Sequence, residues 1–213
     1  MRKRFEQQLE ILNSEMVEMG ELCEKAIKNA VHGLVTGEMG YSKLARQMAG
    51  EIDEKERSIE QLCLKMILQQ QPVAGDLRQI SAALKMITDM ERIGDQAEDI
   101  AEIAATAKKK MLKKSKHIQR MAAATIDMVN KSVEAFIKKD LLIAEEVSHN
   151  DDVVDALFEE IVNDLVDIIK KDEGTSEVLD MLMVAKYFER IGDHAVNIAE
   201  WVQFSITGEH KRL

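Results

Sequence analysis

Apolar side chains recur every three or four residues along almost the whole chain, which is the spacing of amphipathic helices. Two glycines at 37 and 40 interrupt the pattern, Pro72 ends a second run, and Gly174 separates two more. The pattern predicts an all-α fold built from six long helices. They cover residues 5–36, 41–70, 76–109, 118–137, 141–170 and 176–206.

One short segment occurs twice. ERIGD stands at residues 91–95 and again at 189–193, a spacing of 98 residues, and the comparison extended to twelve residues matches at nine. The repeat predicts two tandem, similar three-helix bundles, one over residues 1–110 and the other over 111–213. The lysine-rich stretch 108–116 is the expected joint between them. In both copies a glycine lies inside a helical pattern, where it costs roughly 1 kcal/mol relative to Ala and therefore has a packing or functional reason.

Helix geometry predicts what faces each copy. If the second and third helices fold back near Val73, Asp53 lies 20 residues before the turn and Ile93 lies 20 after it. At ~1.5 Å per residue both are about 30 Å from the turn and therefore level. The same reasoning about a turn near residue 172 places Asp151 level with Asp193. Each ERIGD copy should therefore face a second acidic segment on the neighbouring helix.

These carboxylates are candidate metal ligands. Acids four residues apart share one helix face and repel one another, so two such faces side by side favour a cation between them. Oxygen-rich clusters suit divalent or trivalent ions: iron, Mn²⁺, Mg²⁺, Ca²⁺ or Zn²⁺. Gly94 and Gly192 in the repeats would let a neighbouring backbone approach closely. The candidate ligands are Asp53, Glu91, Asp95, Glu56 and Asp99 in the first half, and Asp151, Asp155, Glu189, Asp193 and Asn197 in the second.

An alternative interpretation needs no metal. The same acids can form solvated helix faces, or they can pair with nearby arginines. Those arginines are Arg57, Arg78, Arg92 and Arg190.

Composition and charge exclude several classes of protein. The net charge of −10 argues against nucleic acid as a partner and is compatible with cations or basic protein surfaces. No apolar run reaches the ~18 residues of a membrane span, so we expect no membrane insertion, although peripheral association remains compatible. Cys23 and Cys63 fit no disulfide framework, and we expect both to be reduced and buried in a cytoplasmic protein.

Two other functions compete with a metal-binding regulator. A di-iron carboxylate enzyme needs Glu-x-x-His on two helices, and the chain has a single match, Glu146 to His149. His194, which follows Asp193, is interpreted as a packing histidine. The chain shows no phosphate-cradling glycine loop, so we do not predict catalysis. The second rival is a metal-free helical adaptor, in which some of the 13 methionines form an adaptable surface.

The segment QQPVAGDLR at residues 70–78, the Leu84–Lys85 pair and the two ERIGD copies together resemble the PhoU family, the accessory regulators of the bacterial phosphate-specific transport system. The resemblance covers the whole chain and implies two three-helix bundles, often as a homodimer. It also implies repression of the phosphate-starvation response and restraint of phosphate uptake. The implied partners are the ATPase subunit of the transporter and a membrane sensor histidine kinase.

The resemblance further implies binding of iron or another metal through E/D-xxx-D motifs. By position these are Glu91/Asp95, Glu189/Asp193 and Asp151/Asp155. The motif on the second helix departs from the pattern, because the residue four after Asp53 is Arg57. If only one half holds metal, we expect it to be the second.

The two halves also differ at their turns. Asp76-Leu77-Arg78 aligns, at the offset of 98, with Gly174-Thr175-Ser176 and so has no counterpart. One interpretation is a partner contact specific to the first half. The other is that Asp76 favours the positive end of a helix dipole while Arg78 bonds a nearby acid.

Overall fold

The computed structural model describes residues 2–70, 72–106, 116–171 and 175–209. They form six α-helices and no strand. The helices are α1 (Arg2–Thr36), α2 (Met39–Gln70), α3 (Ala74–Thr106), α4 (Lys116–Lys138), α5 (Leu141–Lys170) and α6 (Thr175–Thr207). This confirms the predicted all-α class. The predicted joint at 108–116 and the turn near 172 lie almost entirely outside the described residues.

Local chemistry explains where several helices begin and end. Gly37 has a φ of 69°, and its N–H donates to the carbonyl of Gly33 at 2.7 Å, so a left-handed glycine ends α1. The carboxylate of Asp140 accepts a bond from the N–H of Leu142 at 2.9 Å and caps α5. The prediction that Gly40 also interrupts the chain is wrong. Gly40 lies in the first turn of α2, where its missing side chain meets no neighbour.

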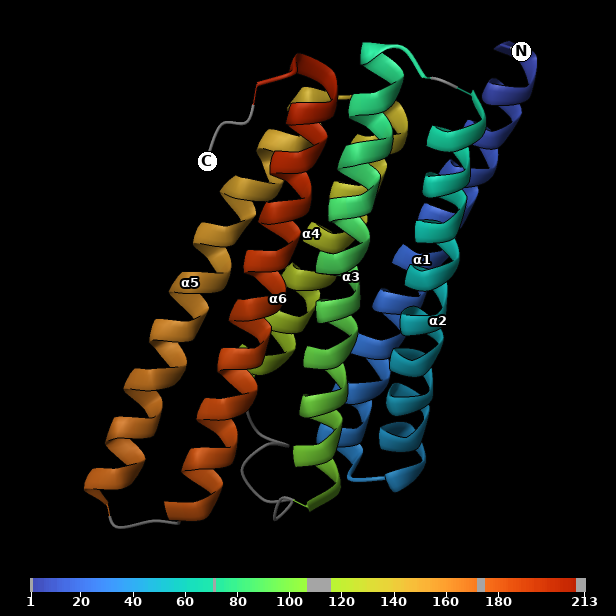
Figure 1. Cartoon of the computed structure of the whole chain (residues 1–213). Coiled ribbons are helices and arrows are strands. Elements are labelled where there is room, and N and C mark those ends of the chain that lie inside the picture. The colour runs from blue at the N-terminus through green and yellow to red at the C-terminus, as the bar shows by residue number, and fades with distance from the viewer. Residues whose placement is uncertain (1, 71, 107–115, 172–174, 210–213) are drawn as a thin grey trace.

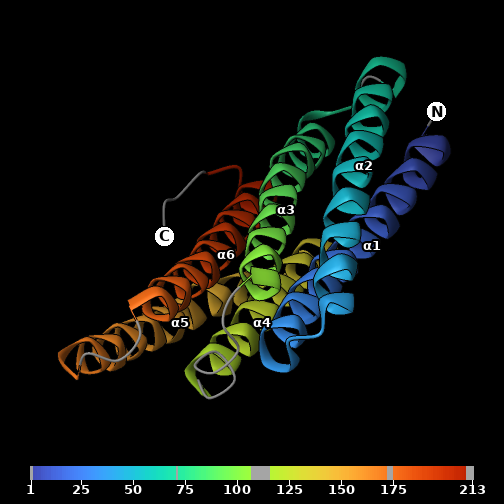
Figure 2. The same cartoon turned by 90° about the horizontal axis from the view of Figure 1, so that it is seen from below.

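The helices form two three-helix groups that pack side by side (Figure 1). In the first, α1 packs on α2 and α3; in the second, α4 packs on α5 and α6. The largest contact between any two helices is between α3 and α6, and a smaller one joins α1 to α4. Viewed from below, α3 and α6 occupy the middle of the molecule (Figure 2). The two ERIGD copies therefore lie on the central pair of helices.

One apolar core runs through both groups. Its largest fully buried side chains come from both halves, and Phe136 and Phe188 are the bulkiest. Cys23 and Cys63 are buried and free, as predicted. Burial raises the pKa of both thiols to about 12, so they behave as small apolar groups rather than nucleophiles.

The two outer hairpins point in opposite directions. The end where α2 meets α3 lies on the same side of the molecule as the N-terminus, and the end where α5 meets α6 lies on the opposite side (Figure 1). The two hairpin ends, which correspond to each other in the duplication, therefore lie at opposite ends of the molecule.

Candidate metal centre

Four predicted ligands of the second half lie along the α5–α6 pair. Asp151 and Asp155 stand one turn apart on α5, and Glu189 and Asp193 stand one turn apart on α6. We call these four residues the α5/α6 cluster. The structure brings them together, as the rise per residue predicts. Glu189 and Asp193 lie close enough to raise the pKa values of both Asp151 and Asp155.

The charge in this cluster is poorly compensated. Burial, then Asp155 and Asp193, raise the pKa of Asp151 to about 6. Burial followed by Glu189 raises the pKa of Asp155 and also that of Asp193. Lys186 contacts Glu189, and the charges of Lys186, His194 and Arg190 partly offset the rise in the pKa of Asp193. No hydrogen bond or ion pair within the described residues reaches the other three carboxylates. Bringing a cation among them would remove this repulsion.

Gly192 allows the cluster to form against the backbone of α6. A Cβ built on Gly192 would lie 2.9 Å from Oδ1 of Asp151, so a side chain there would displace this carboxylate. Gly94, its counterpart in the first half, has an apolar neighbour: a Cβ would lie 3.0 Å from Cδ1 of Ile52. The expectation that a neighbouring backbone approaches these glycines is wrong, because the nearest atoms to each belong to side chains. The glycine of the motif therefore packs against an apolar side chain in the first half and against a carboxylate in the second.

This difference gives opposite expectations for the same substitution. Ile52 is fully buried and cannot move freely, so Gly94→Ala should lower the free energy of unfolding by about 1–2 kcal/mol despite its better helix propensity. In Gly192→Ala the one contact shorter than ordinary packing is with the end of the Asp151 side chain, while Val154 and Met128 lie at 3.6 and 3.7 Å. The substitution should therefore raise that free energy by about 0.5–1 kcal/mol while pushing Asp151 out of place. Urea unfolding of the two variants at neutral pH measures both values. Destabilisation of equal size in both would contradict the assignment.

Some acids of the first half pair with cations of the same half. Arg57 donates to Asp53 at 2.6 Å, as the sequence predicted, and Arg46 pairs with Glu98 at 2.9 Å and with Glu102 at 2.6 Å. Burial, followed by Asp95 and Glu56, still raises the pKa of Glu91, and Asp53 adds a smaller effect. Asp95 itself is exposed. This half therefore offers a weaker site for a cation than the α5/α6 cluster does.

Two predicted ligands lie at the seam between α3 and α6. The amide of Asn197 donates to Oδ1 of Asp89 at 3.2 Å, and Nδ1 of His194 lies 2.9 Å from the same oxygen. Asp99 lies beside the hydroxyl of Tyr187. Burial and Glu102 raise the pKa of Asp99 overall, although this hydroxyl lowers it in part. At the offset of 98, Asp89 corresponds to Tyr187 and Asn197 to Asp99, so these are equivalent contacts across the duplication.

Asp89 is the residue that the sequence analysis missed. It is buried, and it makes the only described polar contact of His194. The available signal was an acid at a core-facing position of the helical pattern, three residues after Met86 and four before Ile93, which is unusual.

The remaining candidates have local roles. Asp76 lies in the first turn of α3, where its charge suits the helix dipole. Arg78 packs over Gly208 at the end of α6, and no acidic partner for it lies among the described residues. Glu146 pairs with Lys131 at 3.2 Å, and His149 bonds a carbonyl of its own helix, so the Glu-x-x-His match does not join the α5/α6 cluster.

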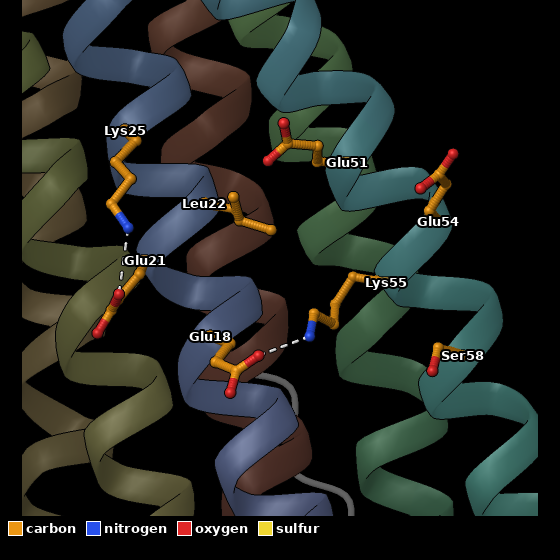
Figure 3. A pocket seen from close by; sticks show the side chains of 8 residues that line it. All are labelled: Glu18, Glu21, Leu22, Lys25, Glu51, Glu54, Lys55 and Ser58. Carbon is orange, nitrogen blue, oxygen red and sulfur yellow. Dashed lines mark hydrogen bonds and ion pairs between the residues drawn. The ribbon is translucent and has the colours of Figure 1, made fainter.

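A separate groove between α1 and α2 has a volume of about 490 Å³ and is lined mainly by charged side chains (Figure 3). Lys55 reaches Glu15 at 2.9 Å and Glu18 at 2.7 Å, and Lys25 pairs with Glu21 at 3.2 Å. Because its lysines already neutralise several of its acids, this groove does not share the unpaired charge of the α5/α6 cluster.

The residues of the α5/α6 cluster fit a hard cation by their chemistry, because all four donors are carboxylates. Within the described residues, however, no three His, Cys, Asp or Glu side chains are already grouped closely enough to hold a metal ion. Binding would therefore depend on side-chain movement between the two helices.

The duplicated three-helix architecture and the acidic hairpins define a class of tandem-repeat helical proteins. The model for the PhoU domain matches the chain twice, at residues 16–104 and 118–202. The chain belongs to the PhoU family.

Individual relatives agree over the full length. A phosphate-specific transport system accessory protein PhoU homolog from Clostridium acetobutylicum is 36% identical, over 100% of this chain and 98% of its own. A homolog with the same name from Pseudomonas aeruginosa is 31% identical, over 99% of this chain and 88% of its own.

Solved structures agree with the fold. The crystal structure of PhoU from Pseudomonas aeruginosa superimposes with a TM-score of 0.86 at 30% identity and covers 96% of this chain and 100% of its own. PhoU from Streptococcus pneumoniae, described as a phosphate transport system regulatory protein, superimposes with a TM-score of 0.91 at 22% identity, covering 98% and 100%. The second likeness bears on the fold alone.

Proposed function

We propose that this chain is a negative regulator of the phosphate-starvation response and of phosphate uptake. The observation that carries the proposal is the full-length similarity to relatives named as accessory proteins of the phosphate-specific transport system. In this proposal the chain acts by protein contact, as a homodimer, on the ATPase subunit of the transporter and on a sensor histidine kinase. It is a regulator rather than an enzyme.

The proposal includes a cation at the α5/α6 cluster. Asp151, Asp155, Glu189 and Asp193 would hold it, and Glu91 with Asp95 would form a weaker site in the first half. The unpaired carboxylates and their raised pKa values support the second half as the stronger site. When bound, the ion supplies charge neutralisation between two helices. The chain's own residues position the carboxylates, and the ion would displace Lys186 from Glu189.

Deletion of the gene in its host tests the regulatory role. At high phosphate the deleted strain should express a phosphate-starvation reporter such as an alkaline phosphatase at about tenfold or more above the parent, because the repressing contact is lost. Complementation with the wild-type chain should restore repression. Measurement of reporter activity and phosphate uptake decides the matter, and a reporter that stays repressed in the deleted strain would refute the role.

A further inference from the structure

The end of the α2–α3 hairpin exposes a group of large apolar side chains. Leu68 is 82% exposed and is the most exposed large apolar residue among those described. Val73, just before α3, is 70% exposed, and Leu64 and Leu77 are also exposed. Leu64 and Leu68 stand one turn apart on α2, and Leu77 follows Val73 by four residues, so the four surround the tip. Apolar groups gathered at one exposed end indicate an interaction surface.

This hairpin end is also cationic in an acidic protein. Residues 61–88 contain three basic residues, Lys65, Arg78 and Lys85, and a single acid, Asp76, for a formal charge of +2 in a chain of −10. α1 begins at the same end of the molecule (Figure 1), and its residues 2–10 contain three basic residues and two acids, Glu6 and Glu10, for a formal charge of +1. The tip therefore complements a negatively charged surface.

The equivalent end of the second half also exposes apolar side chains, but its charge is opposite. The tip of the α5–α6 hairpin exposes Ile169 and Leu179, at 57% and 58%, together with Val166 and Met183. Residues 159–186, which correspond to 61–88 at the offset of 98, contain eight acids and three basic residues, a formal charge of −5. Both hairpin ends thus expose apolar side chains, but only the segment around the α2–α3 turn has a positive formal charge.

We propose that the end of the α2–α3 hairpin docks on an anionic lipid surface. Leu68 and Val73 would enter the headgroup region, and Lys65 with the cations of α1 would lie near the lipid phosphates. A membrane suits this tip because its apolar side chains stand outward on a hairpin end. Lys65, Asp76 and Arg78 lie within about 12 Å of Val73 along their helices. Lys85 and Glu60 lie about 20 Å from it, and the acids level with Asp53 lie about 30 Å from it, beyond the ~10 Å range of unscreened charge at physiological salt. This contact does not depend on the regulatory role proposed above.

No helix in the described part of the chain is long and apolar enough to span a membrane. The docking is accordingly shallow and reversible, and it requires both the apolar and the cationic groups.

Flotation of the full chain with protein-free vesicles tests the proposal. We expect binding to phosphatidylcholine vesicles that contain about one third phosphatidylglycerol and little binding to pure phosphatidylcholine. Leu68→Ser with Val73→Ser should reduce the partition coefficient about tenfold, and Lys65→Glu should reduce it severalfold. Raising the salt from about 0.1 to about 0.5 M should weaken the binding, because charge attraction is screened. The matched control is Ile169→Ser with Leu179→Ser, which changes two exposed large apolar residues at the acidic hairpin end, 57% and 58% exposed, and should leave binding unchanged.

Three results would overturn the proposal. The first is equal binding to neutral and anionic vesicles. The second is an equal loss in the control variant. The third is binding to host membranes that disappears when their proteins are stripped, which would make the occupant a protein. Thermal unfolding of each variant checks that the fold is retained. The reporter assay tests the regulatory role separately, so either proposal can fail without the other.

Discussion

Asp151→Asn is expected to raise the free energy of unfolding of the metal-free chain by about 1–2 kcal/mol at pH 7.5. The pKa of Asp151 is raised to about 6 by burial and by neighbouring acids, so its charge destabilises the folded state at neutral pH. A shift of this size corresponds to about 3 kcal/mol, which partial exposure to solvent reduces. Urea unfolding of the two proteins in the presence of a chelator measures the difference.

The pH dependence follows from the direction of the shift. A carboxylate with a raised pKa in the folded state favours folding when protonated, and this contribution is lost as the pH rises from about 4 through about 6. The metal-free wild type should therefore gain stability relative to Asp151→Asn as the pH is lowered from 7 to about 4.5. Asp53→Asn is the matched control: Asp53 is paired with Arg57, so its replacement should give no stabilisation.

Added Mn²⁺ is expected to make the wild type more stable than a double variant, Asp151→Asn with Asp193→Asn, that lacks two carboxylates of the cluster. With Mn²⁺ at about a hundred times its Kd, the wild type should gain about 2.7 kcal/mol, and Asp151→Asn combined with Asp193→Asn should gain almost nothing. The gain of stability without metal and the loss of the response to metal would then come from the same carboxylates. An equal response to Mn²⁺ in both proteins would refute the cation site in the second half.

Asp89→Ala is expected to lower the free energy of unfolding by about 2–4 kcal/mol. The substitution removes the acceptor of both His194 and Asn197 at the buried seam between α3 and α6 and leaves two polar groups without a partner. Asp89→Asn retains one acceptor oxygen and should cost less. Chemical unfolding of the three proteins at neutral pH gives the comparison.

The duplication supplies the control for this prediction. Asp99→Ala removes the equivalent contact, with the hydroxyl of Tyr187, at a less buried position, and should cost about 1 kcal/mol or less. If Asp99→Ala were as damaging as Asp89→Ala, burial of the carboxylate would not be the cause.

Much of the candidate site could be predicted because it depends on distances along helices. The rise per residue places Asp151 level with Asp193 whatever else the chain does, provided that the two helices form a hairpin. The charge of Arg57 beside Asp53 follows from a spacing of four residues on one helix. Such features need only the local pattern.

The roles of Asn197 and Asp99 could not be predicted in this way. Both lie one turn after the acids of their ERIGD copies and share a helix face with them by spacing alone. The packing of α3 against α6 brings them instead to the seam, opposite Asp89 and Tyr187. Their partners lie about a hundred residues away, which no periodicity indicates.

By itself, the sequence determined the six helices, the duplication, the buried thiols and the acidic segments that lie at the same height on paired helices. These features depend on the spacing of apolar residues and on the rise per residue, which are properties of a single segment and its turn. Only the tertiary structure decided that α3 and α6 form the central contact, that Asp89 holds His194 and Asn197 there, and that the two motif glycines have different neighbours. These outcomes depend on how each helix is rotated about its own axis, and that rotation is set by side chains packing from the other half of the chain.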